Sequence, residues 1–152
     1  MEFNDRNNTV GLPKDLPGTG ARFYEIPSYG DYRGTIAILE WEKLLPFPIR
    51  RMFYTYLVST AEIRGEHAHK HCEQFLLALH GSLSVVADNG FVRETFQLDS
   101  PLRGLHLPAG VWGIQQSHTP DNVLLVLASD PYDPGDYIRD YAEYLEYVKG
   151  KS

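Results

Sequence analysis

The chain has 152 residues, 43% hydrophobic and 22% charged, so its length and composition fit one folded domain and exclude a disordered or fibrous protein. Its formal net charge of −6 argues against binding of nucleic acid through a broad basic face. The longest apolar run, Val123–Ala128, is far too short to span a membrane. The single cysteine, Cys72, excludes a Cys-rich zinc site and fits a reducing compartment, so we expect a cytoplasmic protein.

The first 21 residues are polar, contain several glycines and prolines, and show no apolar period. We expect residues 1–21 to form a mobile N-terminal arm and residues 22–152 to form a single domain. Along that domain, turn residues separate short segments with the composition of β-strands. The predicted strands are Arg22–Ile26, Thr35–Trp41, Ile49–Val58, Glu62–His69, Gln74–Leu79, Ser82–Ala87, Phe91–Leu98, Leu105–Leu107 and Val123–Ala128.

The clearest turn signal is Asn89-Gly90, which follows Asp88. Both central residues of a type I′ turn need a positive φ, and an Asn-Gly pair tolerates that conformation best. The sequence therefore predicts a hairpin that joins the strands Ser82–Ala87 and Phe91–Leu98.

The last segment changes from a strand period to a helix period. Ile138, Tyr141, Leu145 and Val148 follow one another at spacings of three, four and three, which is one stripe of a helix. Asp133 or Asp136 is expected to cap its start. A series of strands followed by one helix predicts an all-β domain, either a β-barrel or a two-sheet jelly roll, with the C-terminal helix outside.

The segment from Arg64 to His71 is the densest in chemical groups. On a strand, residues two apart share a face, so His67 and His69 are expected to point together into the interior. A lone histidine on a strand is more often structural than functional, but two on one face beside an Arg-Gly pair favour a functional site. His71 continues the pattern and is expected at the rim.

The spacing of His67, His69, Gln74 and Gly81 resembles the first motif of the cupin family, H-x-H-x(3,4)-E-x(6)-G. The stretch from Pro108 to Gly113 resembles the second motif. Metal-binding cupins take three His and one Glu from these motifs, whereas here the Glu position is Gln74 and the last His position is Gly113. Since half of that ligand set is missing, we expect no metal, and imidazoles that act as acid and base. A metal-dependent cupin oxygenase is the less favoured alternative.

From about residue 23 to residue 144 the chain resembles the nucleotide-sugar 3,4-ketoisomerases, small cupins that act on dTDP-4-keto-6-deoxyglucose. The resemblance implies a cupin-type fold and an isomerase that needs no metal or redox cofactor, removes the C3 proton and returns a proton at C4. The matching stretches are Asp31–Gly34, Pro46–Tyr54, Arg64–Lys70, Gly104-Leu105, Val111-Trp112, Leu124–Ser129, Tyr132-Asp133 and Asp136–Arg139.

The resemblance implies that His67 is the base and that His69 is its partner in proton delivery or orientation. Tyr54 could donate to a sugar oxygen, although the pattern does not decide which face of its strand it occupies. We expect Gln74 to contact the substrate from the cupin Glu position.

The diphosphate of such a substrate requires local cations in a chain of net charge −6. Arg64 and Arg33 are the first candidates; the alternative for Arg33 is a turn cap, and for Arg64 a surface ion pair. Arg50 and Arg51 point to opposite faces, so at most one enters the pocket, and we choose Arg51. Trp112 either walls the sugar or fills the end of the barrel.

Two positions depart from the family pattern: Phe53 stands where many members have Tyr, and Gly113 where many have His or Arg. These departures leave open whether the product is gluco or galacto at C4. They also keep a second hypothesis open, a cupin that binds a nucleotide sugar without catalysis. Related isomerases are dimers, so we expect a homodimer that exchanges its N-terminal strand, with no nucleic-acid or membrane partner.

Overall fold

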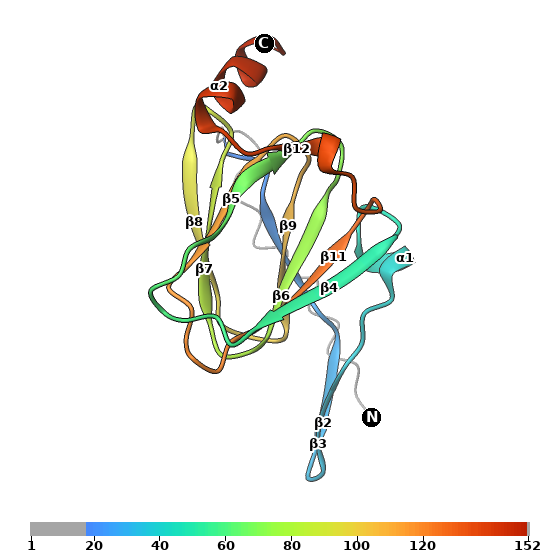
Figure 1. Cartoon of the computed structure of the whole chain (residues 1–152). Coiled ribbons are helices and arrows are strands. Elements are labelled where there is room, and N and C mark those ends of the chain that lie inside the picture. The colour runs from blue at the N-terminus through green and yellow to red at the C-terminus, as the bar shows by residue number, and fades with distance from the viewer. Residues whose placement is uncertain (1–17, 152) are drawn as a thin grey trace.

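Two antiparallel sheets of five strands each form the body of the protein, which is described over residues 18–151 in a computed structural model (Figure 1). The all-β prediction is confirmed in its two-sheet form, because the sheets face each other without closing into a barrel. The first sheet has the order β1 (Arg22–Glu25), β9 (Arg103–Leu107), β6 (Gln74–His80), β11 (Val123–Ala128) and β4 (Arg51–Tyr56). The second has the order β12 (Tyr137–Ile138), β5 (Arg64–His69), β10 (Trp112–Gln116), β7 (Leu83–Asp88) and β8 (Arg93–Leu98).

A two-stranded hairpin, β2 (Ser28–Asp31) and β3 (Gly34–Ala37), projects from the two sheets (Figure 1). The predicted strand Thr35–Trp41 is wrong in its second half, because Trp41 begins the short helix α1 (Trp41–Leu44). Strands β2, β10 and β12 were not predicted, since none of these segments alternates clearly. No helix among residues 18–151 is both long and apolar enough to cross a membrane.

Most of the predicted N-terminal arm, residues 1–17, lies outside the described residues. Of the remainder, Thr19 and Ala21 are buried. The Thr19 hydroxyl and amide both donate to the Glu94 carboxylate on β8, which ties this end of the chain to the edge of the second sheet.

The central strands of the first sheet, β6 and β11, are largely buried on both faces, which explains why they read as continuous apolar runs. The inner face of this sheet contributes Leu76, Leu124 and Val126 to the core between the sheets. Its outer face places Phe75 and Leu127 against the segment that contains α1. The pocket described below opens within the space between the sheets and is therefore walled by a rigid, apolar core.

The predicted hairpin is confirmed, but its type I′ turn is wrong. Strands β7 and β8 pair with Asp88 opposite Arg93, so the connection has four residues. Only Gly90 in this loop has a positive φ, of 89°. The Asn89 side chain instead accepts the amides of Phe91 and Val92, which stabilises the longer loop.

The C-terminal helix is confirmed, but it begins later than its apolar stripe predicts. Helix α2 (Tyr141–Lys149) is capped by Asp140, whose side chain accepts the amide of Glu143. Ile138 lies outside the helix because its backbone pairs with Ala68 in β5. Asp133 caps a 3₁₀ turn, η1 (Pro134–Asp136), instead, and Asp136 is buried at the end of that turn.

Tyr144 anchors α2 to the end of the second sheet. Its side chain is fully buried against Trp112 and Ile138. Its hydroxyl lies 2.8 Å from the carbonyl oxygens of both Asp88 and Gly110. Helix α2 thereby holds the loop at Gly110, whose amide in turn donates to the His69 carbonyl.

We expect Tyr144→Phe to lower the free energy of unfolding by about 1–2 kcal/mol, because the carbonyls of Asp88 and Gly110 lose the one hydroxyl hydrogen that they share. Urea denaturation measures the change. The matched control is Tyr147→Phe on the same helix, which we expect to stay within about 0.5 kcal/mol of the wild type. Equal losses in both variants would contradict the role assigned to the Tyr144 hydroxyl.

Candidate active site

A pocket opens between the sheets, at the end of the molecule that carries η1 and β12. It has polar side chains on one wall, from His67, His69 and Gln74, and apolar ones from Leu107 and Val111. Its cavity volume is about 10 Å³, which is the space of about one water molecule. A sugar-sized ring does not fit within this volume, so a ligand of that size must lie at the mouth of the pocket or displace side chains that line it.

A bulge in β5 sets the direction of the first histidine. Gly65 and Glu66 both have positive φ values, 81° and 53°, and the register with β10 shifts beside them. A Cβ on Gly65 would lie only 2.9 Å from the Gly113 carbonyl oxygen, so the bulge requires glycine there. Beyond the bulge, His67 and His69 share the inner face as predicted, with ring centroids 5.0 Å apart.

The hydrogen bond of His67 determines where its lone pair lies. Its Nδ1 is 2.9 Å from the Gly65 carbonyl oxygen. Because a carbonyl oxygen only accepts, Nδ1 carries the hydrogen and Nε2 carries the lone pair. Burial, and then the neighbouring charge of His69, lower the pKa of His67 to about 4. The ring is therefore neutral at pH 7 and can accept a proton at Nε2.

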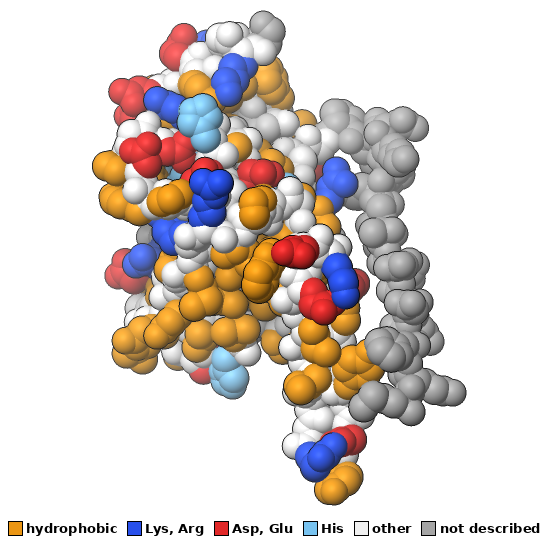
Figure 2. Space-filling model, turned by 90° about the vertical axis from the view of Figure 1, so that its right-hand side faces the viewer, with side chains coloured by type: hydrophobic (Ala, Val, Ile, Leu, Met, Phe, Trp, Pro, Cys, Tyr) orange, Lys and Arg blue, Asp and Glu red, His pale blue; other side chains and the backbone are white. Residues whose placement is uncertain are grey.

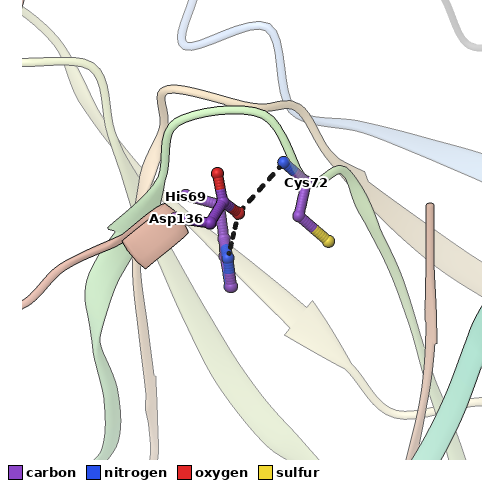
Figure 3. Close-up of side chains that lie close together, drawn as sticks. All are labelled: His69, Cys72 and Asp136. Carbon is purple, nitrogen blue, oxygen red and sulfur yellow. Dashed lines mark hydrogen bonds and ion pairs between the residues drawn. The ribbon is translucent and has the colours of Figure 1, made fainter. Parts of the chain in front are cut away.

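His69 has a different partner, the carboxylate of Asp136 (Figure 3). Its Nδ1 lies 3.0 Å from Asp136 Oδ2. Burial would raise the pKa of the Asp136 carboxyl, but bonds from the His71 amide, the His69 ring and the Cys72 amide hold that pKa below its ordinary value. Burial lowers the pKa of His69, and its bond to the carboxylate offsets this only in part. The pair is thus a carboxylate beside a neutral imidazole.

Potential metal ligands also meet here, since atoms of His69, Cys72 and Asp136 lie within 4.8 Å of one another. The carboxylate, however, already accepts the amides of His71 and Cys72 as well as the His69 ring. The Cys72 thiol points away from the carboxylate in Figure 3. The Asp136 oxygens and His69 Nδ1 are thus committed to hydrogen bonds that fix the imidazole in place.

Of the predicted residues, Gln74 lines the pocket and Arg51 lies beside it. Gln74 is buried and lines its wall. Arg51 shares the inner face of β4 with Phe53, and its Nη2 is 4.0 Å from Cys72 Sγ. The positive charge of Arg51 also acts on His69.

Tyr54 does not reach the pocket within this chain. In the pairing of β4 with β11, Tyr54 lies opposite Leu125 and Phe53 opposite Val126. Val126 belongs to the inner core, whereas Leu125 packs on the outer face of the sheet. Paired residues share a face, so Tyr54 points outward, and 58% of its surface is exposed.

Three further predicted residues lie away from the pocket. Trp112 is on the outer face of the second sheet, with its ring 5.2 Å from Tyr141 and 5.4 Å from Tyr144, so it packs beneath α2. Arg33 is exposed at the tip of the hairpin, where it pairs with Asp31 at 2.6 Å. Arg64 is exposed at the start of β5, the opposite end of that strand from His69.

The sequence did not predict the residues that η1, β12 and the position after β12 place against the two histidines. Besides Asp136, these are Tyr137 and Arg139. The Tyr137 ring lies 4.3 Å from the His69 ring and 5.0 Å from the His67 ring. The Arg139 guanidinium lies 4.2 Å from the centroid of the Tyr137 ring. The alternation of Tyr137 and Arg139 around buried Ile138 is the signal of a short strand, which the helix period of Ile138 obscured.

The family model described as "FdtA: WxcM-like, C-terminal" matches residues 19–149, which include every pocket residue named above. The chain belongs to this family. Among its curated relatives is a TDP-4-oxo-6-deoxy-alpha-D-glucose-3,4-oxoisomerase from Aneurinibacillus thermoaerophilus, 42% identical over 118 residues, which are 78% of this chain and 85% of that protein.

Solved structures of 3,4-ketoisomerases have a similar fold. A 3,4-ketoisomerase from Helicobacter canadensis is similar with a TM-score of 0.83 and 35% identity, over 86% of this chain and 98% of that one. QdtA, a sugar 3,4-ketoisomerase from Thermoanaerobacterium thermosaccharolyticum solved in complex with TDP, also has a TM-score of 0.83, with 32% identity over 86% of this chain and 96% of that one.

The low pKa of His67 predicts a component of stability that depends on pH. The folded-state pKa, about 4, lies below the ordinary value of 6.5, so the unfolded chain binds this proton more readily and stability falls as pH drops from 6.5 towards 4. At pH 5 the loss from His67 is about 2 kcal/mol relative to pH 7.5. We expect urea denaturation at these two pH values to show a smaller difference for His67→Asn than for the wild type. The other buried histidines titrate in both proteins, so an equal difference would contradict the assignment.

Proposed function

We propose that the protein is a sugar 3,4-ketoisomerase that converts dTDP-4-keto-6-deoxyglucose into a dTDP-3-keto-6-deoxyhexose. The observation that carries this proposal is the His67 imidazole, which presents an unprotonated Nε2 in a pocket beside the His69–Asp136 pair. The named relatives support it: one is a 3,4-oxoisomerase of a TDP-4-oxo sugar, and QdtA has been solved with TDP and, as a variant, with TDP-4-keto-6-deoxyglucose.

The reaction requires a base that reaches both C3 and C4. His67 takes the C3 proton, which the adjacent C4 ketone acidifies, and returns a proton to C4 from the same imidazolium. His69, within 5.0 Å, assists in proton delivery and orientation. The change moves protons and electron pairs within the sugar, so it requires no redox cofactor.

Substrate binding follows from the charge around the pocket mouth. Arg51 and Arg139 are the cations whose charges act on the two histidines, and they suit an anionic diphosphate. Gln74 contributes its neutral amide from the wall. The charge of Arg139 contributes to the low pKa of His67. An anionic group of the substrate near Arg139 offsets that charge and raises the pKa of His67, so the bound substrate makes this base stronger.

The enzyme forms a homodimer that exchanges part of its N-terminal region. Strand β4 is an edge strand, and its outer face exposes Met52, Tyr54 and Tyr56 at 58–61%. The hairpin exposes Tyr32 and Ile36, and Figure 2 shows hydrophobic side chains on this face that continue onto the projection. An exposed apolar edge of this kind favours pairing with another chain.

The β2–β3 hairpin best fits the exchanged element, because β1 already pairs with β9 of its own chain. In such a dimer the hairpin brings Arg33 to the second copy, where the guanidinium has a route to the diphosphate. Tyr54 then lies in the interface. Arg64 stays a candidate for the nucleotide beyond the pocket, and Trp112 acts by supporting the wall from beneath α2. A reducing cytoplasm accords with the free thiol of Cys72.

We expect the wild type to sediment as a dimer at micromolar concentration and Tyr54→Lys to sediment as a monomer, because the charge would be buried against an apolar face. Analytical ultracentrifugation measures both. The control is Phe91→Lys, an exposed aromatic on the β7–β8 loop, which should leave the dimer intact. A monomeric wild type, or a dimeric Tyr54→Lys variant, would contradict this interface.

The activity is tested by proton NMR in deuterated water, with chelator present, on protein mixed with TDP-4-keto-6-deoxyglucose. The wild type should produce the 3-keto sugar, with deuterium at C4 where the His67 imidazolium exchanges with solvent before it reprotonates that carbon. A parallel reaction in ordinary water gives the H4–H5 coupling, which distinguishes gluco from galacto stereochemistry. His67→Asn should lower turnover by about 10²-fold or more and leave TDP affinity within a few-fold, since a base acts mainly in the transition state. His80→Asn, an exposed histidine of β6, is the matched control.

Other outcomes of this assay decide between the remaining hypotheses. Bound TDP with no hydrogen exchange and no product would favour the non-catalytic nucleotide-sugar-binding cupin. Activity that appears only when chelator is omitted would favour a metal-dependent enzyme. Full turnover by His67→Asn would remove His67 from the mechanism.

A further inference from the structure

The two histidines of the pocket present the same free nitrogen. His67 Nδ1 lies 2.9 Å from the Gly65 carbonyl oxygen, and His69 Nδ1 lies 3.0 Å from Asp136 Oδ2. Both partners only accept, so each Nδ1 carries the hydrogen and each Nε2 carries a lone pair. His69 is 5% exposed, and its Nε2 is buried without a hydrogen-bond partner among residues 18–151. A buried polar atom in this state is expected to find its partner in a ligand.

These hydrogen bonds have the arrangement that is typical of metal-binding histidines. Such a histidine donates its second ring N–H to a carboxylate or a backbone carbonyl, which fixes the ring and directs the other nitrogen towards the metal. The Asp136 carboxylate is itself fixed, because it accepts the amides of His71 and Cys72. It therefore holds the His69 ring in one orientation.

Cys72 adds a thiol to the same pocket. Its side chain is 2% exposed and lines the pocket with His67 and His69. Its Sγ lies 3.4 Å from the Glu73 carbonyl oxygen and 4.0 Å from Arg51 Nη2. Sulfur is a weak hydrogen-bond donor and a weak acceptor, so these contacts compete poorly with a metal ion, for which a thiolate is a strong ligand.

The space between these side chains suits a single ion. The cavity volume is about 10 Å³, which is room for about one water molecule. Ligand atoms of His69 and Cys72 lie within 4.8 Å of each other, and the His67 and His69 rings have centroids 5.0 Å apart. A tetrahedral Zn²⁺ with bonds of about 2.0–2.3 Å holds its ligand atoms roughly 3.3–3.8 Å apart, so side-chain movements of about 1–2 Å close the site.

The types of donor select the metal. Imidazole and thiolate suit Zn²⁺, whereas Mg²⁺ and Ca²⁺ prefer oxygen ligands. Of the four positions that bind metal in cupins, Gln74 and Gly113 offer no charged donor here. Cys72 lies outside that set of positions and supplies the anionic ligand that the set lacks.

The charges around His69 favour a metal that exchanges with solution. The Asp136 carboxylate favours positive charge at His69, whereas the Arg51 and Arg139 guanidinium groups oppose it. A Zn²⁺ ion held by three protein ligands also keeps one coordination position open. We therefore expect reversible binding.

We propose that His67, His69 and Cys72 form a binding site for Zn²⁺, and that this ion inhibits the enzyme. On binding, the Cys72 thiol releases its proton to solvent, and the metal occupies both Nε2 lone pairs. His67 then has no lone pair with which to accept the C3 proton. The inhibition rests on the proposed function, whereas the binding site does not.

A first test uses Co²⁺ as a coloured substitute for Zn²⁺ and needs no variant. A cobalt–thiolate bond gives a charge-transfer absorption in the near ultraviolet, and Cys72 is the only cysteine of the sequence. We expect the full, untagged chain to develop this band on titration with Co²⁺, and Zn²⁺ to displace the cobalt and abolish the band, since Zn²⁺ binds such sites more tightly. Absence of the band would overturn the proposal.

Variants then identify the other ligands. Cys72→Ser should abolish the band, and His69→Asn should weaken Co²⁺ binding by about 10-fold or more, since even a residue that only orients a ligand contributes that much. His80→Asn, an exposed histidine of β6, is the matched control and should keep the wild-type affinity. Unchanged affinity in folded His69→Asn, or equal losses in the two histidine variants, would contradict this ligand set.

The inhibition is measured separately. Zn²⁺ should stop formation of the 3-keto sugar, chelator should restore it, and Cys72→Ser should need about 10-fold more Zn²⁺ or more for half inhibition. An enzyme that keeps its full rate with Zn²⁺ bound would overturn the inhibitory role. A protein that gives the cobalt band but neither exchanges nor isomerises the sugar would instead refute the proposed function, so the two failures are distinguishable.

Discussion

The buried carboxylate of Asp136 is the constraint on which the rest of the pocket depends. It lies at the end of η1 and accepts three N–H groups, two from the backbone of the loop after β5 and one from the His69 ring. The next two residues pair with β5 as β12. One side chain therefore closes a loop, docks an edge strand and orients an imidazole, and these functions cannot be separated by local changes in the chain.

The second sheet and α2 support this arrangement from outside. Trp112 and Tyr144 pack behind β5 and β10, and the Tyr144 hydroxyl holds the carbonyl of Gly110. The Gly110 amide donates to the His69 carbonyl at 2.6 Å. The backbone of His69 is thus held from both sides, which is the preorganisation that proton transfer over short distances requires.

The structure shows the surroundings of the two residues that depart from the family pattern, Phe53 and Gly113. Phe53 lies on the inner face of β4 and contributes a ring beside Arg51 without a hydroxyl. At Gly113 a Cβ would lie 2.9 Å from Leu107 Cδ2, so a larger residue there requires the end of the Leu107 side chain to move. Acid–base chemistry at the pocket wall is accordingly concentrated in His67 and His69, which increases the importance of how each ring is oriented.

Local sequence pattern alone predicted most strands, the hairpin between β7 and β8 and the existence of the C-terminal helix. It also predicted that His67 and His69 share a face. These features are local because strand alternation and turn residues act over a few positions. Pairings between distant segments decided the rest. The face of Tyr54 depends on its register with Leu125, the start of α2 on the pairing of Ile138 with Ala68, and the tautomer of His69 on a carboxylate 67 residues away. No periodicity encodes such contacts, since they form only when the two sheets and the edge strand β12 have assembled.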